Sequence, residues 1–398
     1  MVTLSAPGKI RYMFRANTHV HSPYSFSSFD SIETMVKKAS KESIDVLGIN
    51  DFNTFDGYSE FEQYSKEKGV YPLFNVEFRC ITGNTESQPC RWNDPFDFDI
   101  IYLCGKGLKS QVKLSIDSTN RIKSLWKGTQ DHIWKILSKL NSYLDDVNLD
   151  VTLDYCEIRS TYSKGTLRER HLAKALYHKF IAKWQEKTDL SRAFNKLFKS
   201  ELNIKDPYDE NRMQDEILTR LFKSDKPAFV KHTVDTAIQM EDARDIILQA
   251  GGIPCYPLLG DALKGLTEKE ASVDKLITEL KKVNIHAVEF ISNRCSIEYI
   301  KETTYRFKEK GFCVTFGTEH NQPEMLPLLP TTRGNVPFDS ELLKTAHEGA
   351  CIIAAHQELN RANRIGFVES CGKRSDLKLS DLVQKGQSAI QKRINVPV

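Results

Sequence analysis

The sequence predicts a mixed α/β protein whose strands form a parallel sheet or a closed barrel. Short apolar runs such as 44–50 ("IDVLGIN") and 70–78 ("VYPLFNVEF") alternate with segments of helical periodicity. In the first of those segments Ile32, Met35 and Val36 recur at the spacing of one helix face. Strands that alternate with amphipathic helices are typical of βα units around a parallel sheet or barrel.

The alternation predicts seven or so strands in all. The expected strands cover residues 11–21, 44–50, 70–78, 98–105, 253–257, 285–292 and 312–320. The expected helices between them cover residues 31–43, 57–68, 241–250, 273–284 and 296–311.

Two stretches interrupt or follow the alternation. We expect residues 11–107 and 228–330 to form the barrel, and the charged segment 108–227 to be a mainly helical insertion at its mouth. A Pro-rich connector leads into residues 331–398, which we expect to be a C-terminal helical extension.

Composition narrows the class of protein. A net charge of +3 in 398 residues makes no case for a nucleic-acid binder. Nine cysteines without a C-x-x-C pair indicate reduced thiols. We see neither a signal-peptide core nor a run near the ~18 apolar residues of a membrane span. These features predict a cytoplasmic protein with no membrane partner.

Metal-ligand residue types gather where the predicted strands end. His19 and His21 are two residues apart on the first strand, so both imidazoles should emerge on the same face. In closed α/β barrels the chemistry lies at the carboxyl ends of the strands. The other polar residues at such positions are Asp51, Glu77, Asp97, Asp99, Glu319, His320 and Asn321. Imidazoles with carboxylates suit zinc, manganese or iron.

Six motifs together resemble a known family. "HVHSPYSF", "GINDFNTFDGY", "VEF", "ERHLAKAL", "QAGGIPCYP" and "FGTEHN" follow the motif order of the PHP (polymerase and histidinol phosphatase) superfamily over residues 11–325. The sequence looks most like its stand-alone phosphoesterases. The resemblance implies a distorted (β/α)7 barrel, up to three metal ions at its mouth, and phosphoester hydrolysis.

The resemblance also implies a set of ligands. One metal would be held by His19, His21, Glu77 and Glu319, the last in place of the usual aspartate. A second would share Glu77 as a bridge and use His171 and Asp99.

The third family site looks absent. Where the family has an Asp-His pair this chain has Asp51 and Phe52, and where it has a final histidine this chain has Asn321. Phenylalanine cannot coordinate a metal, although Asp51 remains a candidate ligand, an acceptor that orients a histidine, or a cap of the following turn. We therefore expect two divalent ions (Zn, Mn or Fe).

Other residues have less specific roles. Arg79 on the strand of Glu77, Arg170 next to His171, and Arg294 after a later strand are candidates for binding phosphate. Arginines at a barrel rim, however, often form ion pairs. Asp30 fits a helix N-cap better than a ligand. The remaining histidines are expected to be surface or structural residues: His132, His178, His232, His286, His347 and His356.

Three functions remain open on the sequence. The first is a metal-dependent phosphoesterase acting on a small phosphate ester, a nucleotide or an oligonucleotide end. The second is a metal-dependent hydrolase of a non-phosphate bond, and the third is a degenerate barrel used for binding. Without a Gly-rich phosphate loop or a nucleophile elbow, nucleophilic Ser or Cys catalysis has no support.

Overall fold

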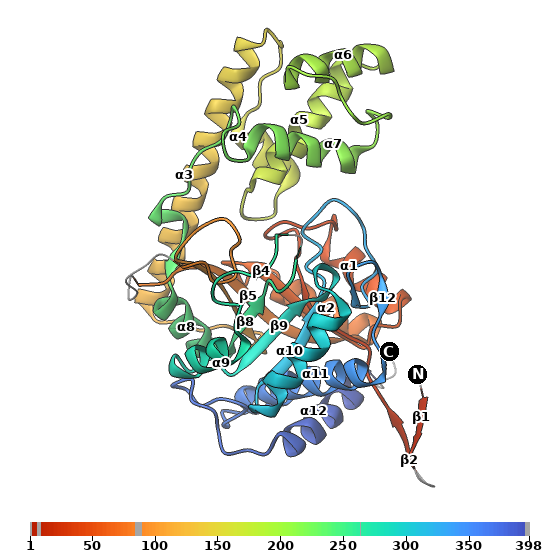
Figure 1. The fold of residues 1–398 in the computed structure, drawn as a ribbon, viewed down its shortest axis with the longest axis vertical. Coiled ribbons are helices and arrows are strands. Elements are labelled where there is room, and N and C mark those ends of the chain that lie inside the picture. Colours follow the sequence, from red (N-terminus) through yellow and green to blue (C-terminus); the bar gives the residue numbers. More distant parts are fainter. Residues whose placement is uncertain (1, 6–8, 84–89, 263, 395–398) are drawn as a thin grey trace.

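A curved sheet of seven strands forms the centre of the molecule (Figure 1). The computed structural model describes residues 2–5, 9–83, 90–262 and 264–394. Hydrogen bonds link the strands in the order β10-β9-β8-β6-β5-β4-β3. Their bounds are β3 (Ala16–Val20), β4 (Val46–Phe52), β5 (Tyr71–Ile81), β6 (Ile100–Lys106), β8 (Ile253–Leu258), β9 (Ala287–Ile291) and β10 (Cys313–Gly317).

The two edge strands of this sheet meet and nearly close it into a barrel. The backbone N–H groups of Thr318 and Glu319 donate to the carbonyl of His19 over 3.2 and 2.9 Å. Gly317 permits the approach, because a Cβ there would lie 2.2 Å from the Cβ of His19. The predicted distorted (β/α)7 barrel is thereby confirmed.

One strand runs against the expected direction. β6 is antiparallel to both of its neighbours, β5 and β8. The described part of the connection 82–99 contains no helix, so the chain returns directly beside β5, as an antiparallel pair allows. The start of β6 therefore lies at the same end of the barrel as the carboxyl ends of the parallel strands. A further short strand, β7 (Ile238–Gln239), pairs with the end of β5.

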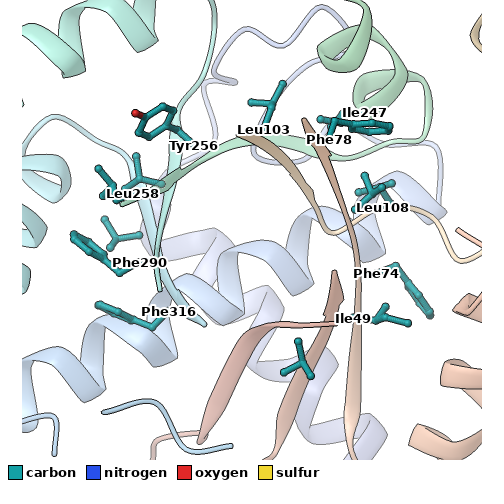
Figure 2. Packing of buried hydrophobic residues seen from close by; sticks show 14 of the residues in the cluster. Ile49, Phe74, Phe78, Leu103, Leu108, Ile247, Tyr256, Leu258, Phe290 and Phe316 are labelled. Atoms are coloured by element: carbon teal, nitrogen blue, oxygen red, sulfur yellow. The ribbon is translucent and has the colours of Figure 1, made fainter. Parts of the chain in front are cut away.

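Alternate side chains of the strands form the core between the sheet and its outer helices. Figure 2 shows Ile49, Phe74, Phe78, Phe290 and Phe316 pointing away from the interior of the arch, and all are buried. The helices that cover them are α1 (Ile32–Lys41), α2 (Tyr58–Lys68), α8 (Met240–Gln249), α9 (Val273–Lys282) and α10 (Ile297–Glu309). The remaining strand residues face the barrel interior, where the site is found.

A group of helices stands beyond the mouth of the barrel, and its long first helix starts beside α8 at the side of the barrel (Figure 1). It comprises α3 (Ile116–Asp146), α4 (Tyr155–Tyr162), α5 (Glu169–Lys183), α6 (Lys187–Phe198) and α7 (Glu210–Ile217), followed by the short π-helix η1 (Leu218–Phe222) and the 3-10 helix η2 (Val234–Thr236). These helices share an apolar cluster of their own, which includes Leu140, Leu172 and Phe194. The boundaries 108–227 for a separate insertion stay a prediction.

The opposite end of the barrel is sealed by the C-terminal helices. α11 (Ser340–Arg361) and α12 (Leu379–Ile394) pack under the sheet. Ile353 of α11 and Leu382 of α12 are buried in one cluster with Ala16, Leu73 and Ala287 from the strand starts. α11 and α12 thus lie at the end opposite the mouth, whereas Arg333, near the start of the predicted extension, donates to the backbone carbonyl of Arg294. Residues 395–398 of the predicted extension are outside the described residues.

The remaining elements are short. The predicted strand 11–21 is divided, because β2 (Lys9–Tyr12) pairs with β1 (Val2–Ser5) and the barrel strand begins only at Ala16. β11 (Thr331–Thr332) and β12 (Val336–Pro337) form a small ladder of their own. Among the described helices, none combines the length and the apolar character needed to cross a membrane.

Candidate metal centre

Two imidazoles and one carboxylate converge inside the barrel mouth. The Nε2 atoms of His19 and His21 are 3.3 Å apart. Oε2 of Glu77 lies 3.2 Å from the first nitrogen and 3.5 Å from the second. Both histidines are fully buried and Glu77 is 4% exposed. Three ligand atoms of metal-binding type therefore face one small volume.

The local backbone explains this convergence. His19 is on β3 and His21 directly follows it, so the two side chains share a face, as their spacing predicts. The N–H of His21 donates to the carbonyl of Glu319 over 2.8 Å, which fixes the strand end against the chain after β10. Glu77 is in the middle of β5 and alternates with the outward-pointing Phe78, so its carboxylate points inward.

A fully buried ion pair orients His19 from behind. Nδ1 of His19 lies 2.6 Å from Oε2 of Glu289, and the same oxygen lies 2.5 Å from Nζ of Lys106. The hydroxyl of Thr18 donates to the other carboxylate oxygen over 2.6 Å. A carboxylate that accepts Nδ1–H leaves Nε2 as the lone-pair nitrogen, which is the arrangement found behind metal-binding histidines.

Asn50 completes the polar interior. Its Oδ1 accepts from Nζ of Lys106 over 2.9 Å, so its amide nitrogen faces the site. That nitrogen lies 3.0 Å from Nε2 of His19 and 3.4 Å from Oε2 of Glu77. Lys106 thereby holds both Asn50 and Glu289 in place.

The protonation states match a site built for a cation. Burial acts to lower the pKa of His19, but Glu289 and Glu77 outweigh it and raise that pKa to about 9. Burial and the neighbouring His19 keep the pKa of His21 well below its ordinary value. Lys106 and His19 overcome burial and lower the pKa of Glu289 to about 2. The two carboxylates Glu289 and Glu77 thus stabilise one positive charge between them, which protonated His19 carries. A bound metal ion would supply that charge in its place, with His19 neutral.

The donor set fits a divalent metal. Two imidazole nitrogens and a carboxylate oxygen are ligands that zinc, manganese and iron accept. The contacts of His19 with Cys104 and Glu289 form an alternative group of possible ligands. Because Glu289 already pairs with Lys106, a second cation there would be repelled, and we assign Glu289 to positioning rather than ligation.

Glu319 lies beside this group but faces another partner. Its carboxylate forms an ion pair with Arg294 and accepts from the side-chain amide of Asn321 over 2.9 Å. Glu319 and His320 both have positive φ angles, +62° and +54°, which are sparsely populated for residues other than glycine. A strained turn therefore holds Glu319 at the mouth, and its role as a ligand stays a prediction.

The two arginines proposed for phosphate binding have different surroundings. Arg79 shares the inward face of β5 with Glu77, and its guanidinium pairs with Asp97 over 2.7 Å. Arg170 pairs with Asp215 over 2.7 Å, and its guanidinium lies 5.6 Å from the ring centre of Phe26. Of the two, Arg79 is the one on the same strand as a residue of the metal-ligand group.

Asp51 is engaged with the loop that follows β3. Its carboxylate accepts from the backbone N–H of Ser22 over 2.7 Å and from the hydroxyls of Ser22 and Ser25 over 2.5 and 2.7 Å. Beside it the Phe52 ring stacks on His21, with centroids 4.8 Å apart. An aromatic ring thus occupies the position of the missing family histidine, and the structure does not bring Asp51 into the ligand group.

His171 and Asp99 also lie outside that group. Nδ1 of His171 accepts the backbone N–H of Arg168 over 2.9 Å, and the ring meets the Phe26 ring edge-on. Asp99 precedes β6 with a positive φ of 58°. Neither belongs to a cluster of possible metal ligands among the described residues. A second metal held by these residues stays a prediction.

The sequence reasoning missed the residues behind the ligands. Glu289 stands in the apolar run "AVEFI" and Lys106 ends the apolar strand "IIYLCGK". A charged residue in an otherwise buried strand is a signal in itself, because isolated buried charges are too costly to keep without a partner. Of the histidines predicted to be surface or structural residues, His132 is buried next to Glu169.

The fold and this site define a class of protein, the α/β barrels that carry a group of possible metal ligands inside the mouth. The PHP domain family model matches residues 17–224, which is more than half of the chain. The chain therefore belongs to the PHP domain family.

Solved structures give the same fold. An amidohydrolase from Chromobacterium violaceum, with bound sulfate and no metal, superposes with a TM-score of 0.51 at 14% identity, covering 80% of this chain and 94% of its own. A protein from Bifidobacterium adolescentis, provisionally named a metal-dependent phosphoesterase, also gives 0.51 at 14%, covering 84% and 95%. No curated protein sequence matches significantly.

Proposed function

We propose that the protein is a metal-dependent hydrolase that cleaves a phosphate ester. The observation that carries the proposal is the convergence of His19 Nε2, His21 Nε2 and Glu77 Oε2 within 3.5 Å of one another. Membership of the PHP domain family and the structure of the same fold that is named a metal-dependent phosphoesterase support a metal-dependent hydrolase.

Different residues of the site would hold the metal ion, orient its ligands and line the mouth. His19, His21 and Glu77 would hold a divalent ion (Zn, Mn or Fe), and Glu289 keeps the Nδ1 proton of His19 so that Nε2 faces the ion. Such an ion polarises a phosphoryl oxygen and makes a water molecule a stronger acid. Glu319 and Asn321 are adjacent polar groups at the mouth.

Arginine side chains supply the complementary charge for a phosphate group. Arg79 follows Glu77 on the inward face of β5 and is 8% exposed, whereas Arg294 is more open beside Glu319. Guanidinium groups bind phosphate oxygens in a bidentate manner. Each of these arginines is paired with a carboxylate, Asp97 or Glu319, that a phosphate would displace.

Hydrolysis of an amide-type bond is the second candidate. The relative from Chromobacterium violaceum is called an amidohydrolase. Phe52 also makes the ligand set smaller than the family pattern, and one metal ion suffices for such a hydrolase.

A substrate panel separates these functions. Purified protein supplied with Mn²⁺ or Zn²⁺ would be assayed on phosphate monoesters, nucleotide bisphosphates, 5′-phosphorylated oligonucleotides and N-acyl amino acids. We expect turnover of a phosphate ester, and we expect Glu77→Ala and His21→Ala to lower kcat/KM by about 100-fold or more.

A matched control excludes a general loss of structure. His178 is a half-buried histidine on α5 that pairs with Glu210, away from the mouth, so His178→Ala should keep full activity. Turnover of the acyl substrates alone would overturn the phosphoesterase proposal and favour the second candidate. Turnover that survives Glu77→Ala would contradict the metal centre itself.

A further inference from the structure

We infer that His132, Glu169 and His232 form a second, separate binding site for a divalent ion of the zinc type. His132 is on α3, Glu169 is the first residue of α5, and His232 precedes η2. One ligand atom from each residue lies within 4.8 Å of the other two. Three segments that are far apart in the sequence thus bring two imidazoles and a carboxylate together.

An unpartnered nitrogen points to a ligand at this position. His132 is 4% exposed, and its Nε2 has no hydrogen-bond partner. The same atom lies 3.9 Å from Oε1 of Glu169, too far for a hydrogen bond. Buried polar atoms are rarely left without a partner. Because the carboxylate of Glu169 faces His132 Nε2, a cation between the two groups would satisfy both.

The neighbours of His232 fix which of its nitrogens is free. The hydroxyl of Thr236 donates to the carbonyl of Thr233 over 2.8 Å, so its oxygen must accept from Nδ1 of His232 at 3.2 Å. Nδ1 therefore carries the proton and Nε2 keeps the lone pair. This is the tautomer that a metal-binding imidazole needs, set by a hydrogen bond behind the ring.

The geometry requires only a small adjustment to close on an ion. The rings of His132 and His232 stack with centroids 4.2 Å apart and planes at 22°. Two ligands of one zinc ion, each bound at about 2.0–2.2 Å, lie roughly 3–4 Å apart. The ligand atoms lie within 4.8 Å of one another and His232 is exposed in a loop, so a shift of about 1 Å would close the set on an ion.

The charges around the site favour a metal that neutral imidazole binds well. The carboxylate of Glu169 supplies the one negative charge of the set, and the two imidazoles supply nitrogen ligands. Arg79, Arg168 and Lys135 oppose a cation, while Asp97 pairs with Arg79 and offsets it. With two nitrogens and one oxygen, Zn²⁺, Co²⁺ or Ni²⁺ should bind in preference to Mg²⁺ or Ca²⁺.

The position of the site gives it a structural consequence. Thr236, which holds His232, also accepts from Nη1 of Arg79 over 3.4 Å. Arg168, next to Glu169, lies 4.5 Å over the Phe52 ring that stacks on His21. An ion here would tie α3, α5 and the 232–236 segment to the barrel rim. The inference does not rest on the proposed hydrolysis.

Metal stoichiometry tests the inference directly. Full-length protein would be stripped with chelator, equilibrated with Zn²⁺, passed through gel filtration and analysed by mass spectrometry, with Co²⁺ absorption bands as a second readout. The variants are His232→Ala, Glu169→Gln and His132→Gln, each with His178→Ala as the matched histidine control. All four would also be made in a Glu77→Ala background, and circular dichroism would confirm folding.

We expect about one Zn²⁺ per chain to be lost in each of the three variants, in both backgrounds, and none to be lost in His178→Ala. His232→Ala is decisive, because this exposed residue can be removed without disturbing the core. Equal Zn²⁺ in His232→Ala and the parent protein would overturn the inference. So would Co²⁺ bands that depend on Glu77 but not on His232.

Discussion

The two ends of the barrel interior are built on opposite principles. At the strand starts, Leu73 and Ala287 pack with Ile353 of α11 in a buried apolar cluster. Nearer the mouth, Lys106 and Glu289 form an ion pair with no exposed surface. Burial of apolar groups stabilises a fold, whereas a buried ion pair is often no more stable than an apolar replacement. The apolar packing at the strand starts therefore stabilises the fold, whereas the buried ion pair nearer the mouth positions the residues of the candidate metal site.

Removing one partner of the buried pair should have the largest effect on stability. Glu289→Ala leaves Lys106 buried without its carboxylate and His19 without its orienting partner. We expect a loss of about 3–5 kcal/mol in the free energy of unfolding, measured by urea denaturation, together with loss of bound metal.

The double variant Glu289→Leu with Lys106→Met sharpens the comparison. Because both charges are removed, most of the stability should return while metal binding stays weak. If the double variant is as unstable as Glu289→Ala, the ion pair itself stabilises the fold. That result would contradict the claim that stability comes mainly from the apolar cluster at the strand starts.

Shortening an apolar side chain at the strand-start end of the barrel should lower stability without changing metal binding. Ile353 is fully buried, so Ile353→Ala should cost about 2–5 kcal/mol through lost burial and the cavity left behind. Metal content per folded chain should not change. A fall in metal content at temperatures where the variant is folded would mean that the two ends are coupled.

A buried carboxyl group near the mouth should make stability depend on pH. Burial raises the pKa of Glu270 to about 7, although Tyr256 and the N–H groups of Leu259 and Gly260 donate to it. The folded state thus binds this proton more tightly than the unfolded chain, whose pKa is about 4.3. This proton's contribution to the free energy of unfolding is fully present below about pH 4. It falls by about 3 kcal/mol as the pH rises to about 7.

Denaturation of Glu270→Gln across this range measures the effect. The slope of stability against pH between about 4 and 7 should flatten relative to the parent protein and to the exposed control Glu298→Gln. An unchanged slope would assign the pH dependence to other groups.

The smallest expected effect comes from restoring an imidazole. The Phe52 ring lies 4.8 Å from the His21 ring, so Phe52→His places a nitrogen ligand beside the centre. We expect Zn²⁺ affinity to rise roughly tenfold, or about 1.4 kcal/mol, in a calorimetric titration. Phe55→His, a short distance along the chain, should leave it unchanged. Equal affinities in all three proteins would mean that position 52 does not face the metal.

The sequence predicts the strands and the shared face of His19 and His21 well because both depend on local periodicity. The spacing of His19 and His21 places them on one face, and Glu77 alternates with buried Phe78. The direction of β6 depends on a connection without a helix, which short apolar runs do not reveal.

Contacts between distant segments could not be predicted in the same way. Glu289 contacts His19 although the two are 270 positions apart in the sequence. His132 stacks on His232, which lies in a loop whose conformation depends on tertiary packing. No periodicity in the sequence reports such pairs. A charged residue in an apolar strand marks Glu289, but it does not name its partner.

Metal content of the purified protein tests the central claim most directly. Protein prepared without chelators, then supplied with Zn²⁺ or Mn²⁺, would be analysed by mass spectrometry beside Glu77→Ala. The account predicts bound metal in the parent protein and a loss of about one equivalent in Glu77→Ala, because this carboxylate completes the set with His19 and His21. Equal metal in the two proteins, or none in either, would contradict it.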